Sequence, residues 1–218
     1  MKATIASLIF LLLSLAVSSQ TYKYIGIEEG LSNQKIYRIQ KDARGYMWFL
    51  THVGIDRYNG KEIKHYKLKE GDRELDPLLN INWTYLDKTG TLLVTGKQGR
   101  IFRYDSGHDR FVQIYSMYNY WNKDYHAFVR YSYIDQESNV WLCDKSAIHL
   151  FNIESGQKQR ISNRLGNITC IEQINSEHFF IGTDKRIYLV KLENGNLKEL
   201  SCGKLEMMDM HVHELYLH

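Results

Sequence analysis

A repeat of about 45 residues dominates this sequence. In three copies an aspartate precedes a large apolar residue by six positions: Asp42 and Trp48, Asp87 and Leu93, Asp135 and Trp141. A fourth, shorter copy runs from Ile168 to Val190. Repeats of 40 to 50 residues with strand-like content are typical of β-propeller blades. The repeat therefore constrains the fold before any single residue does.

Each copy predicts four antiparallel strands. In the first copy, residues 42–45 form a turn between two short apolar runs, and residues 58–61 (Tyr-Asn-Gly-Lys) are typical of a hairpin. A repeated aromatic residue in a blade usually packs between adjacent sheets, so both tryptophans are expected to be buried. The residues predicted to form the structural core of the blades are Trp48, Trp141, Gly45, Gly54, Gly90 and Gly99.

The predicted fold class is all-β: an incomplete β-propeller of four-stranded antiparallel blades, about four blades plus the start of a fifth. The partial propeller is expected over residues 20–218. Its blades are placed approximately at residues 30–70, 78–116, 127–162 and 166–200, with the start of another at 207–218. An incomplete ring leaves two blade faces uncovered, so the chain is expected to associate. Tyr22 to Ile27 is expected to add a short, unpaired strand before the first blade.

Residues 1–19 are predicted to be a signal peptide. Lys2 is followed by an apolar stretch of about 15 residues, and small residues precede Gln20, where cleavage is expected. The alternative is a retained membrane anchor, but that stretch is shorter than the roughly 20 residues that span a bilayer. The chain is therefore expected in the periplasm.

The remaining composition gives little support to catalysis, metal binding or nucleic-acid binding. The formal net charge is +3, which offers no electrostatic case for nucleic acid. No common catalytic motif is present, so no catalytic residues, enzyme activity or cofactors are predicted. His211 and His213 could share a strand face, but no third ligand is identifiable and no metal site is predicted. Cys143, Cys170 and Cys202 are expected to be mainly buried thiols, although two could be bridged.

One aromatic-rich segment lies between the second and third blades. Sugar rings present apolar faces that stack on aromatic side chains, while nearby amides and carboxylates bind hydroxyls. The alternatives are local packing and docking against a partner domain. The residues expected to contact a ligand are Tyr118, Tyr120, Trp121 and Tyr125.

The first copy resembles the two-component regulator propeller. The resemblance rests on Glu29-Gly-Leu-Ser32, on Asp42-Ala-Arg-Gly45-Tyr-Met-Trp48, and on Gly54-Ile-Asp-Arg-Tyr-Asn-Gly60. Later copies keep less of this pattern, since Leu93 replaces the tryptophan in the second and Ser138 replaces a glycine in the third.

The resemblance implies the periplasmic sensor region of a hybrid histidine kinase regulator of the kind found in Bacteroidetes. Its expected ligand is an oligosaccharide. Its expected partners are further propeller blades, the kinase parts of a longer, inner-membrane-anchored phosphorelay protein, and a second copy in a dimer. The chain itself would be a truncated, non-catalytic sensing segment. The alternatives are an exported propeller enzyme, such as a glycan lyase or hydrolase, and a non-sensing scaffold.

Overall fold

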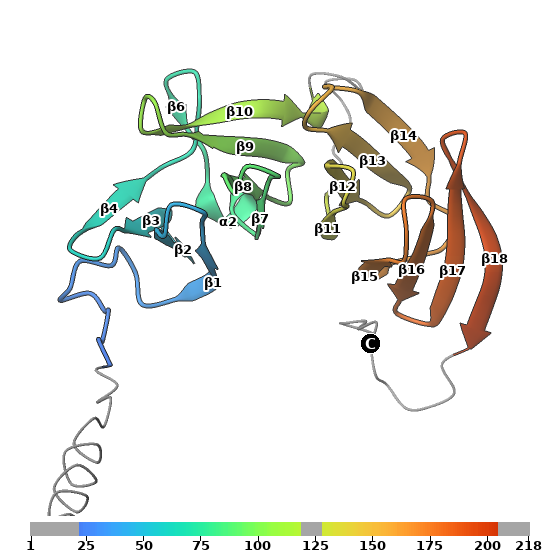
Figure 1. Cartoon of the computed structure of the whole chain (residues 1–218), viewed down its shortest axis with the longest axis horizontal. Coiled ribbons are helices and arrows are strands. Elements are labelled where there is room, and N and C mark those ends of the chain that lie inside the picture. The colour runs from blue at the N-terminus through green and yellow to red at the C-terminus, as the bar shows by residue number, and fades with distance from the viewer. Residues whose placement is uncertain (1–21, 119–127, 205–218) are drawn as a thin grey trace, which may run out of the picture.

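Four four-stranded antiparallel sheets make up most of the computed structural model, which describes residues 22–118 and 128–204. Figure 1 shows the sheets side by side in an arc, with the first strand of each on the inner side. The strands of the first two sheets are β1 (Ile36–Lys41), β2 (Met47–Thr51), β3 (Ile55–Tyr58), β4 (Ile63–Tyr66), β7 (Trp83–Leu86), β8 (Leu92–Thr95), β9 (Arg100–Asp105) and β10 (Arg110–Ser116). Those of the third and fourth are β11 (Tyr131–Ile134), β12 (Asn139–Cys143), β13 (Ala147–Asn152), β14 (Lys158–Ser162), β15 (Ile168–Gln173), β16 (His178–Thr183), β17 (Arg186–Glu193) and β18 (Asn196–Lys204). This arrangement confirms the predicted propeller blades.

A short insertion separates the first two blades. It contains the two-stranded hairpin of β5 (Lys69–Glu70) and β6 (Arg73–Glu74), followed by α2 (Pro77–Asn80). Asp76 caps α2 by accepting a hydrogen bond from the backbone N–H of Leu78 at 2.9 Å, and Pro77 opens the helix, where a missing N–H costs nothing. The hairpin and helix thus connect the outer strand of one blade to the inner strand of the next.

The hydrophobic core lies between consecutive blades. Side chains alternate across each strand, so the two faces of an inner blade pack against different neighbours. In the second blade, Leu92 and Val94 pack with Trp48 of the first blade, whereas Leu93 packs with Val140 and Leu142 of the third. A further cluster joins the third and fourth blades around Trp141 and Phe179, whose rings lie 4.8 Å apart. Stability therefore depends on the stacking of neighbouring blades.

An aspartate closes the turn between the first two strands of three blades. In the first blade, Asp42 Oδ1 accepts the backbone N–H groups of Arg44 and Tyr46, and Asp42 Oδ2 accepts Trp48 Nε1 at 2.8 Å. The third blade repeats the indole contact, from Trp141 Nε1 to Asp135 Oδ2 at 2.9 Å. The carboxylate thus fixes the turn and the buried indole together.

The second blade lacks this indole and fills its place differently. Asp87 Oδ1 again accepts backbone N–H groups, from Thr89 and Thr91. Its Oδ2 pairs with Arg103 Nη2 at 2.6 Å, where the other blades place the tryptophan nitrogen. The guanidinium charge takes the place of the indole N–H, so loss of the tryptophan leaves the carboxylate in an ion pair.

Left-handed backbone recurs at one position of these turns. Gly45, Gly90 and Ser138 have φ of +85°, +72° and +67°. The Gly90 turn also touches the first blade, because a Cβ there would lie only 2.3 Å from the Cβ of Ala43, and Ala43 donates its N–H to the Gly90 carbonyl. A side chain at position 90 would therefore separate two blades as well as strain the turn.

The prediction of a strand at Tyr22–Ile27 is wrong. Residues 22–25 have no regular structure, and residues 27–30 form a turn in which Gly30 has φ of +108°. Leu31 is buried after this turn, and Ser32 donates both its N–H and its hydroxyl to Asp56 Oδ2 on β3. The segment therefore packs on the first blade through side chains and a turn instead of pairing as a strand.

Outside the described residues lie the predicted signal peptide at 1–19, the predicted start of a fifth blade at 207–218, and the pair His211 and His213. Within the described residues, no helix has the length and apolar character that a membrane crossing requires. All three cysteines are free thiols, and Cys143 and Cys170 are buried.

Candidate functional site

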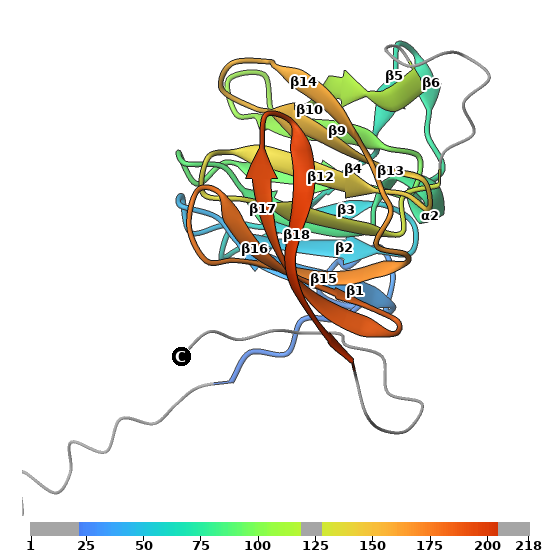
Figure 2. The same ribbon diagram turned by 90° about the vertical axis from the view of Figure 1, so that its right-hand side faces the viewer.

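Two kinds of loop meet at one edge of the blades. Successive strands of an antiparallel sheet reverse direction, so the loop between the second and third strands ends on the same side as the connection to the next blade. We call this edge the connection face, formed by residues 77–82, 96–99, 144–146, 163–167 and 184–186. Figure 2 shows α2, which belongs to such a connection, at one edge of the sheets. Propeller loops at one such edge can converge on a shared depression.

A basic pocket opens on the connection face between the third and fourth blades. Its cavity is about 500 Å³, within the size range of small-molecule sites. Five cationic side chains and a single carboxylate, that of Asp184, line it. Within residues 22–118 and 128–204, none of the five cations pairs with a carboxylate. The lining residues are Arg130, Lys145, Arg164, Leu165, Gly166, Asn167, Asp184, Lys185, Arg186 and Tyr188.

Hydrogen bonds fix the loop that carries Arg164. Asn163 Nδ2 donates to the carbonyls of Asp144 and Gly166, at 3.1 and 2.9 Å, and Asn163 Oδ1 accepts the N–H of Leu165. The Tyr188 hydroxyl donates to the Leu165 carbonyl at 3.3 Å. One amide thus joins the blade-to-blade connection to the loop of the third blade, and the wall of the basic pocket is preformed.

The neighbouring loop of the fourth blade is closed by a threonine. Thr183 Oγ1 accepts the N–H groups of Lys185 and Arg186 and donates to the Arg186 carbonyl at 3.0 Å. The loop carbonyls and N–H groups are therefore satisfied locally, and the long side chains of Lys185 and Arg186 extend from a fixed backbone.

An unsatisfied acceptor lies in the lining. Asn167 Oδ1 is buried and has no hydrogen-bond partner, although its backbone carbonyl accepts the N–H of Asp184 at 3.2 Å. A buried polar atom without a partner is costly, so such atoms often mark a position that water or a ligand fills. Because this atom only accepts, its partner must bring a donor group.

The two described ends of the aromatic-rich segment lie beside the second blade on the connection face. Of the predicted ligand contacts, Tyr118 is described, and the Arg100 guanidinium lies over its ring at 5.1 Å. Tyr120, Trp121 and Tyr125 lie outside the described residues. Where the chain resumes, Phe128 is exposed, and Lys97 Nζ lies 5.5 Å from its ring. The ends of the segment are therefore placed, and both are held against cationic side chains of the second blade.

A second polar cluster lies at the outer rim of the first two blades. Asp109 accepts hydrogen bonds from Lys64, Tyr66 and Tyr104, and Arg57 pairs with it at 2.8 Å. Burial opposes ionisation, but the bonds from Lys64 and the tyrosines, with the Arg57 charge, hold the pKa of Asp109 well below its usual range. Burial and the bond to Asp109 raise the pKa of Tyr104 to about 12. Arg57 and Lys64 belong to the first blade and Asp109 to the second, so these ion pairs join the two blades.

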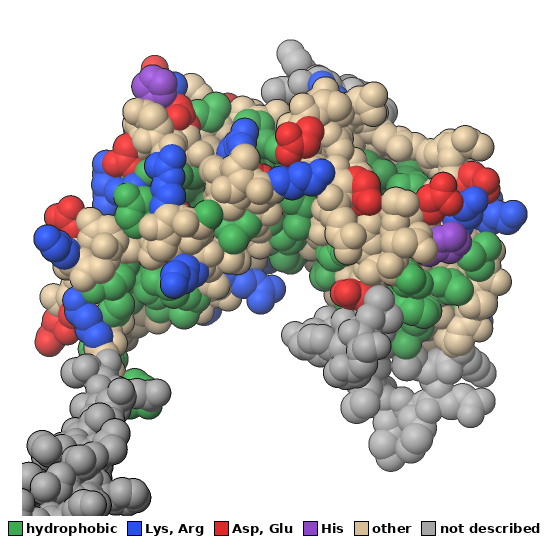
Figure 3. Space-filling model, in the orientation of Figure 1, with side chains coloured by type: hydrophobic (Ala, Val, Ile, Leu, Met, Phe, Trp, Pro, Cys, Tyr) green, Lys and Arg blue, Asp and Glu red, His purple; other side chains and the backbone are tan. Residues whose placement is uncertain are grey.

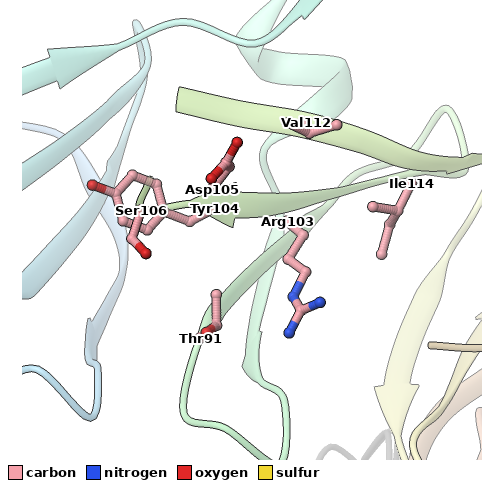
Figure 4. Close-up of a pocket in the computed structure, with 7 residues that line it drawn as sticks. All are labelled: Thr91, Arg103, Tyr104, Asp105, Ser106, Val112 and Ile114. Carbon is pink, nitrogen blue, oxygen red and sulfur yellow. The ribbon is translucent and has the colours of Figure 1, made fainter. Parts of the chain in front are cut away.

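A smaller depression of about 320 Å³ lies along the outer part of the second blade. Figure 4 shows the Arg103 side chain projecting from β9 beside Ile114, with Thr91 on the adjacent turn. Arg103 is the partner of Asp87. Burial acts against the ionised carboxylate, but hydrogen bonds from Thr89 and Thr91 and the charge of Arg103 lower the pKa of Asp87 overall. The polar group of this depression is thus already engaged in the blade structure.

The predicted core residues occupy the blades as follows. Trp48 and Trp141 are fully buried. A Cβ at Gly54 would lie 2.8 Å from the Tyr66 carbonyl oxygen, and one at Gly99 would lie 2.1 Å from Met117 Sδ. No group of three or more potential metal ligands gathers within the described residues. The sequence alone does not reveal the basic pocket, because its cations are scattered along the chain.

Comparisons with known proteins agree with this architecture. Residues 30–52 match the family model described as "Two component regulator propeller", so the first blade carries a repeat of that family, as its motifs predicted. No curated protein matches the sequence.

Solved structures of related shape cover most of the described blades. The extracellular domain of the putative hybrid two component system BT3049 from B. thetaiotaomicron aligns with a TM-score of 0.61 and 16% identity, over 82% of this chain and 26% of that one. PorZ from Porphyromonas gingivalis, a surface component of the type-IX secretion system, aligns with a TM-score of 0.55 and 14% identity, over 82% of this chain and 24% of that one. The chain thus spans about a quarter of the length of either structure, and the similarity establishes the propeller fold.

Proposed function

We propose that the chain is an extracytoplasmic, ligand-sensing propeller segment of a hybrid two-component regulator, that it responds to oligosaccharide, and that it is non-catalytic. The observation that carries this proposal is the two-component regulator propeller repeat in a blade stack shaped like the extracellular domain of such a system. The proposed location is the periplasm, with the complete regulator anchored in the inner membrane. The proposed partners are further blades, the kinase parts of that regulator and a second copy in a dimer.

The connection face supports ligand binding. The basic pocket is preformed by hydrogen-bonded loops, which lowers the entropic cost of binding. Tyr118 and Phe128 mark the ends of an aromatic-rich segment on the same face, and aromatic side chains suit the apolar faces of sugar rings. The basic pocket offers one carboxylate, Asp184, whereas glycoside hydrolysis ordinarily needs two flanking the bond. A sensing role therefore fits this face better than a hydrolytic one.

Binding of the full chain to a glycan array tests the proposal, with affinities of positive glycans measured by calorimetry. The double variant Tyr120→Ala with Trp121→Ala should lose at least about tenfold in affinity, since each stacked aromatic contributes about 1 kcal/mol or more. The matched control is Tyr22→Ala with Tyr24→Ala, which removes two exposed aromatic side chains away from the connection face.

Two results would contradict the proposal. Absence of binding to every glycan on the array would overturn oligosaccharide sensing. Shortened products in the mass spectrum of a bound glycan would overturn the non-catalytic role.

A further inference from the structure

The basic pocket has five cationic side chains, of which Arg186 also donates a hydrogen bond to Cys202 Sγ at 3.8 Å. Arg130 precedes β11, Lys145 follows β12, Arg164 lies in the blade connection, and Lys185 and Arg186 precede or begin β17. These five side chains share the cavity with one carboxylate. Like charges gathered in a concave site repel one another, and such a site attracts an anion from solution.

The charge pattern elsewhere on the molecule differs. Figure 3 shows one face on which Lys and Arg side chains lie interspersed with Asp and Glu. Lys191, for example, lies 3.3 Å from Glu177 and 3.2 Å from Glu193. With a formal net charge of +3 over 218 residues, the chain has no general basic surface. The excess is local, which favours a compact anionic ligand over nucleic acid or a membrane surface.

The buried acceptor adds a second requirement. Asn167 Oδ1 has no hydrogen-bond partner, and a bare anion would offer it none. Because Oδ1 is buried, the Asn167 side chain must turn toward the cavity before a sugar hydroxyl can donate to it, while an acidic substituent of the same molecule meets Arg164 or Lys185. Tyr188, which also lines the cavity, is an aromatic residue of the kind that contacts sugar rings.

We propose that the basic pocket binds an acidic oligosaccharide, with the arginines and lysines taking its carboxylate or sulfate groups and Asn167 accepting one of its hydroxyls. This inference rests on the proposed sensing function and narrows its ligand class. Arg164 lies in the connection between the third and fourth blades and Lys185 in a loop of the fourth blade, so a bound ligand also ties that connection to the fourth blade.

The test is calorimetry on the full chain at low salt with four probes: trigalacturonate, a heparin-derived disaccharide, neutral maltotriose, and inorganic sulfate. At least one acidic saccharide should bind about tenfold or more tightly than maltotriose, because charge-assisted hydrogen bonds are about twice as strong as neutral ones.

Matched variants separate the pocket from overall charge. Arg164→Gln with Lys185→Gln should weaken acidic saccharide binding about tenfold or more. Arg44→Gln with Lys88→Gln removes the same charge from exposed turns at the opposite edge and should leave affinity unchanged. Asn167→Asp tests the acceptor, since a carboxylate placed there should repel the acidic probes, and an unchanged Tm would show that the variant still folds.

Equal binding of maltotriose and the acidic probes, with no effect of Arg164→Gln and Lys185→Gln, overturns the acidic ligand and leaves oligosaccharide sensing intact. Binding of inorganic sulfate without either acidic saccharide overturns the saccharide ligand of this pocket. Absence of binding by all four probes overturns the inference, and the glycan array then decides the sensing function separately.

Discussion

The pairing of Asp42 with Trp48 makes a sharp prediction about stability. The carboxylate is buried and accepts three hydrogen bonds, two from backbone N–H groups at Oδ1 and one from the indole at Oδ2. Asp42→Asn preserves the size of the side chain but converts one oxygen into an N–H₂ donor. In one orientation this donor faces the indole N–H, and in the other it faces the two backbone N–H groups.

The expected cost is about 3 kcal/mol in the free energy of unfolding. A hydrogen bond to a charged group contributes about 1.5–3 kcal/mol, and a buried donor left without a partner costs about 1–3 kcal/mol, of which relaxation recovers part. Asp87→Asn is the matched control. Its Oδ1 contacts repeat those of Asp42, but its Oδ2 partner is Arg103, whose side chain is 41% exposed and can turn to water. We expect a cost of about 1 kcal/mol there.

Thermal unfolding followed by tryptophan fluorescence measures both variants under one set of conditions. For a chain of this size, 1 kcal/mol lowers Tm by about 2–4 °C, so Asp42→Asn should lose about 6–12 °C and Asp87→Asn about 2–4 °C. Equal losses would refute the reasoning, because Oδ2 accepts a buried indole N–H in the first turn and faces the partly exposed Arg103 in the second.

Three further predictions follow from the described residues. The pKa of Asp109 is depressed in the folded state, so its ionised carboxylate stabilises the fold above about pH 3.9 and this stabilisation is lost as pH falls. Acid should therefore lower the urea midpoint of the wild type more than that of Asp109→Asn, and equal decreases would contradict this. Cys202 should react with iodoacetamide before the buried Cys143 and Cys170, as peptide mass spectrometry would show, and prior labelling of Cys143 would be inconsistent. The half-buried Phe180 should promote self-association of the chain, and light scattering should show that Phe180→Lys reduces it. A wild type that is a monodisperse monomer would contradict this prediction.

The blade architecture could be predicted from the sequence because each blade repeats one local arrangement of turn and strands. A turn aspartate, a left-handed residue three positions later and an apolar strand recur at fixed spacing, and Ser138 keeps the left-handed backbone where glycine is lost. The segment Tyr22–Ile27 does not form the predicted strand. Its actual structure depends on the later Gly30 turn and on Ser32 reaching Asp56, contacts that local periodicity does not encode.

The candidate site was much harder to predict. The aromatic-rich segment was visible as a composition change, so Tyr118 and its neighbours were identified directly. The basic pocket draws on Arg130, Lys145, Arg164 and the pair 185–186, which are unremarkable one at a time. These positions come together only because the loops between the second and third strands lie at the same edge as the blade connections. The spacing of the cations along the sequence does not show this.

The two edges of the blades therefore differ in role: one holds the turns that fix the packing, and the other holds the candidate ligand site. The aspartate turns lie at the edge opposite the connection face. In the second blade Leu93 replaces the tryptophan, and Arg103 pairs with the aspartate instead. In the fourth blade Phe180 replaces the tryptophan and Ile174 replaces the aspartate. Phenylalanine has no N–H to satisfy, so a carboxylate at position 174 would lack its indole partner. The motif that identifies the family is thus a packing device. The connection face is free of that constraint, which is why the ligand must be inferred from its charges and its unsatisfied acceptor.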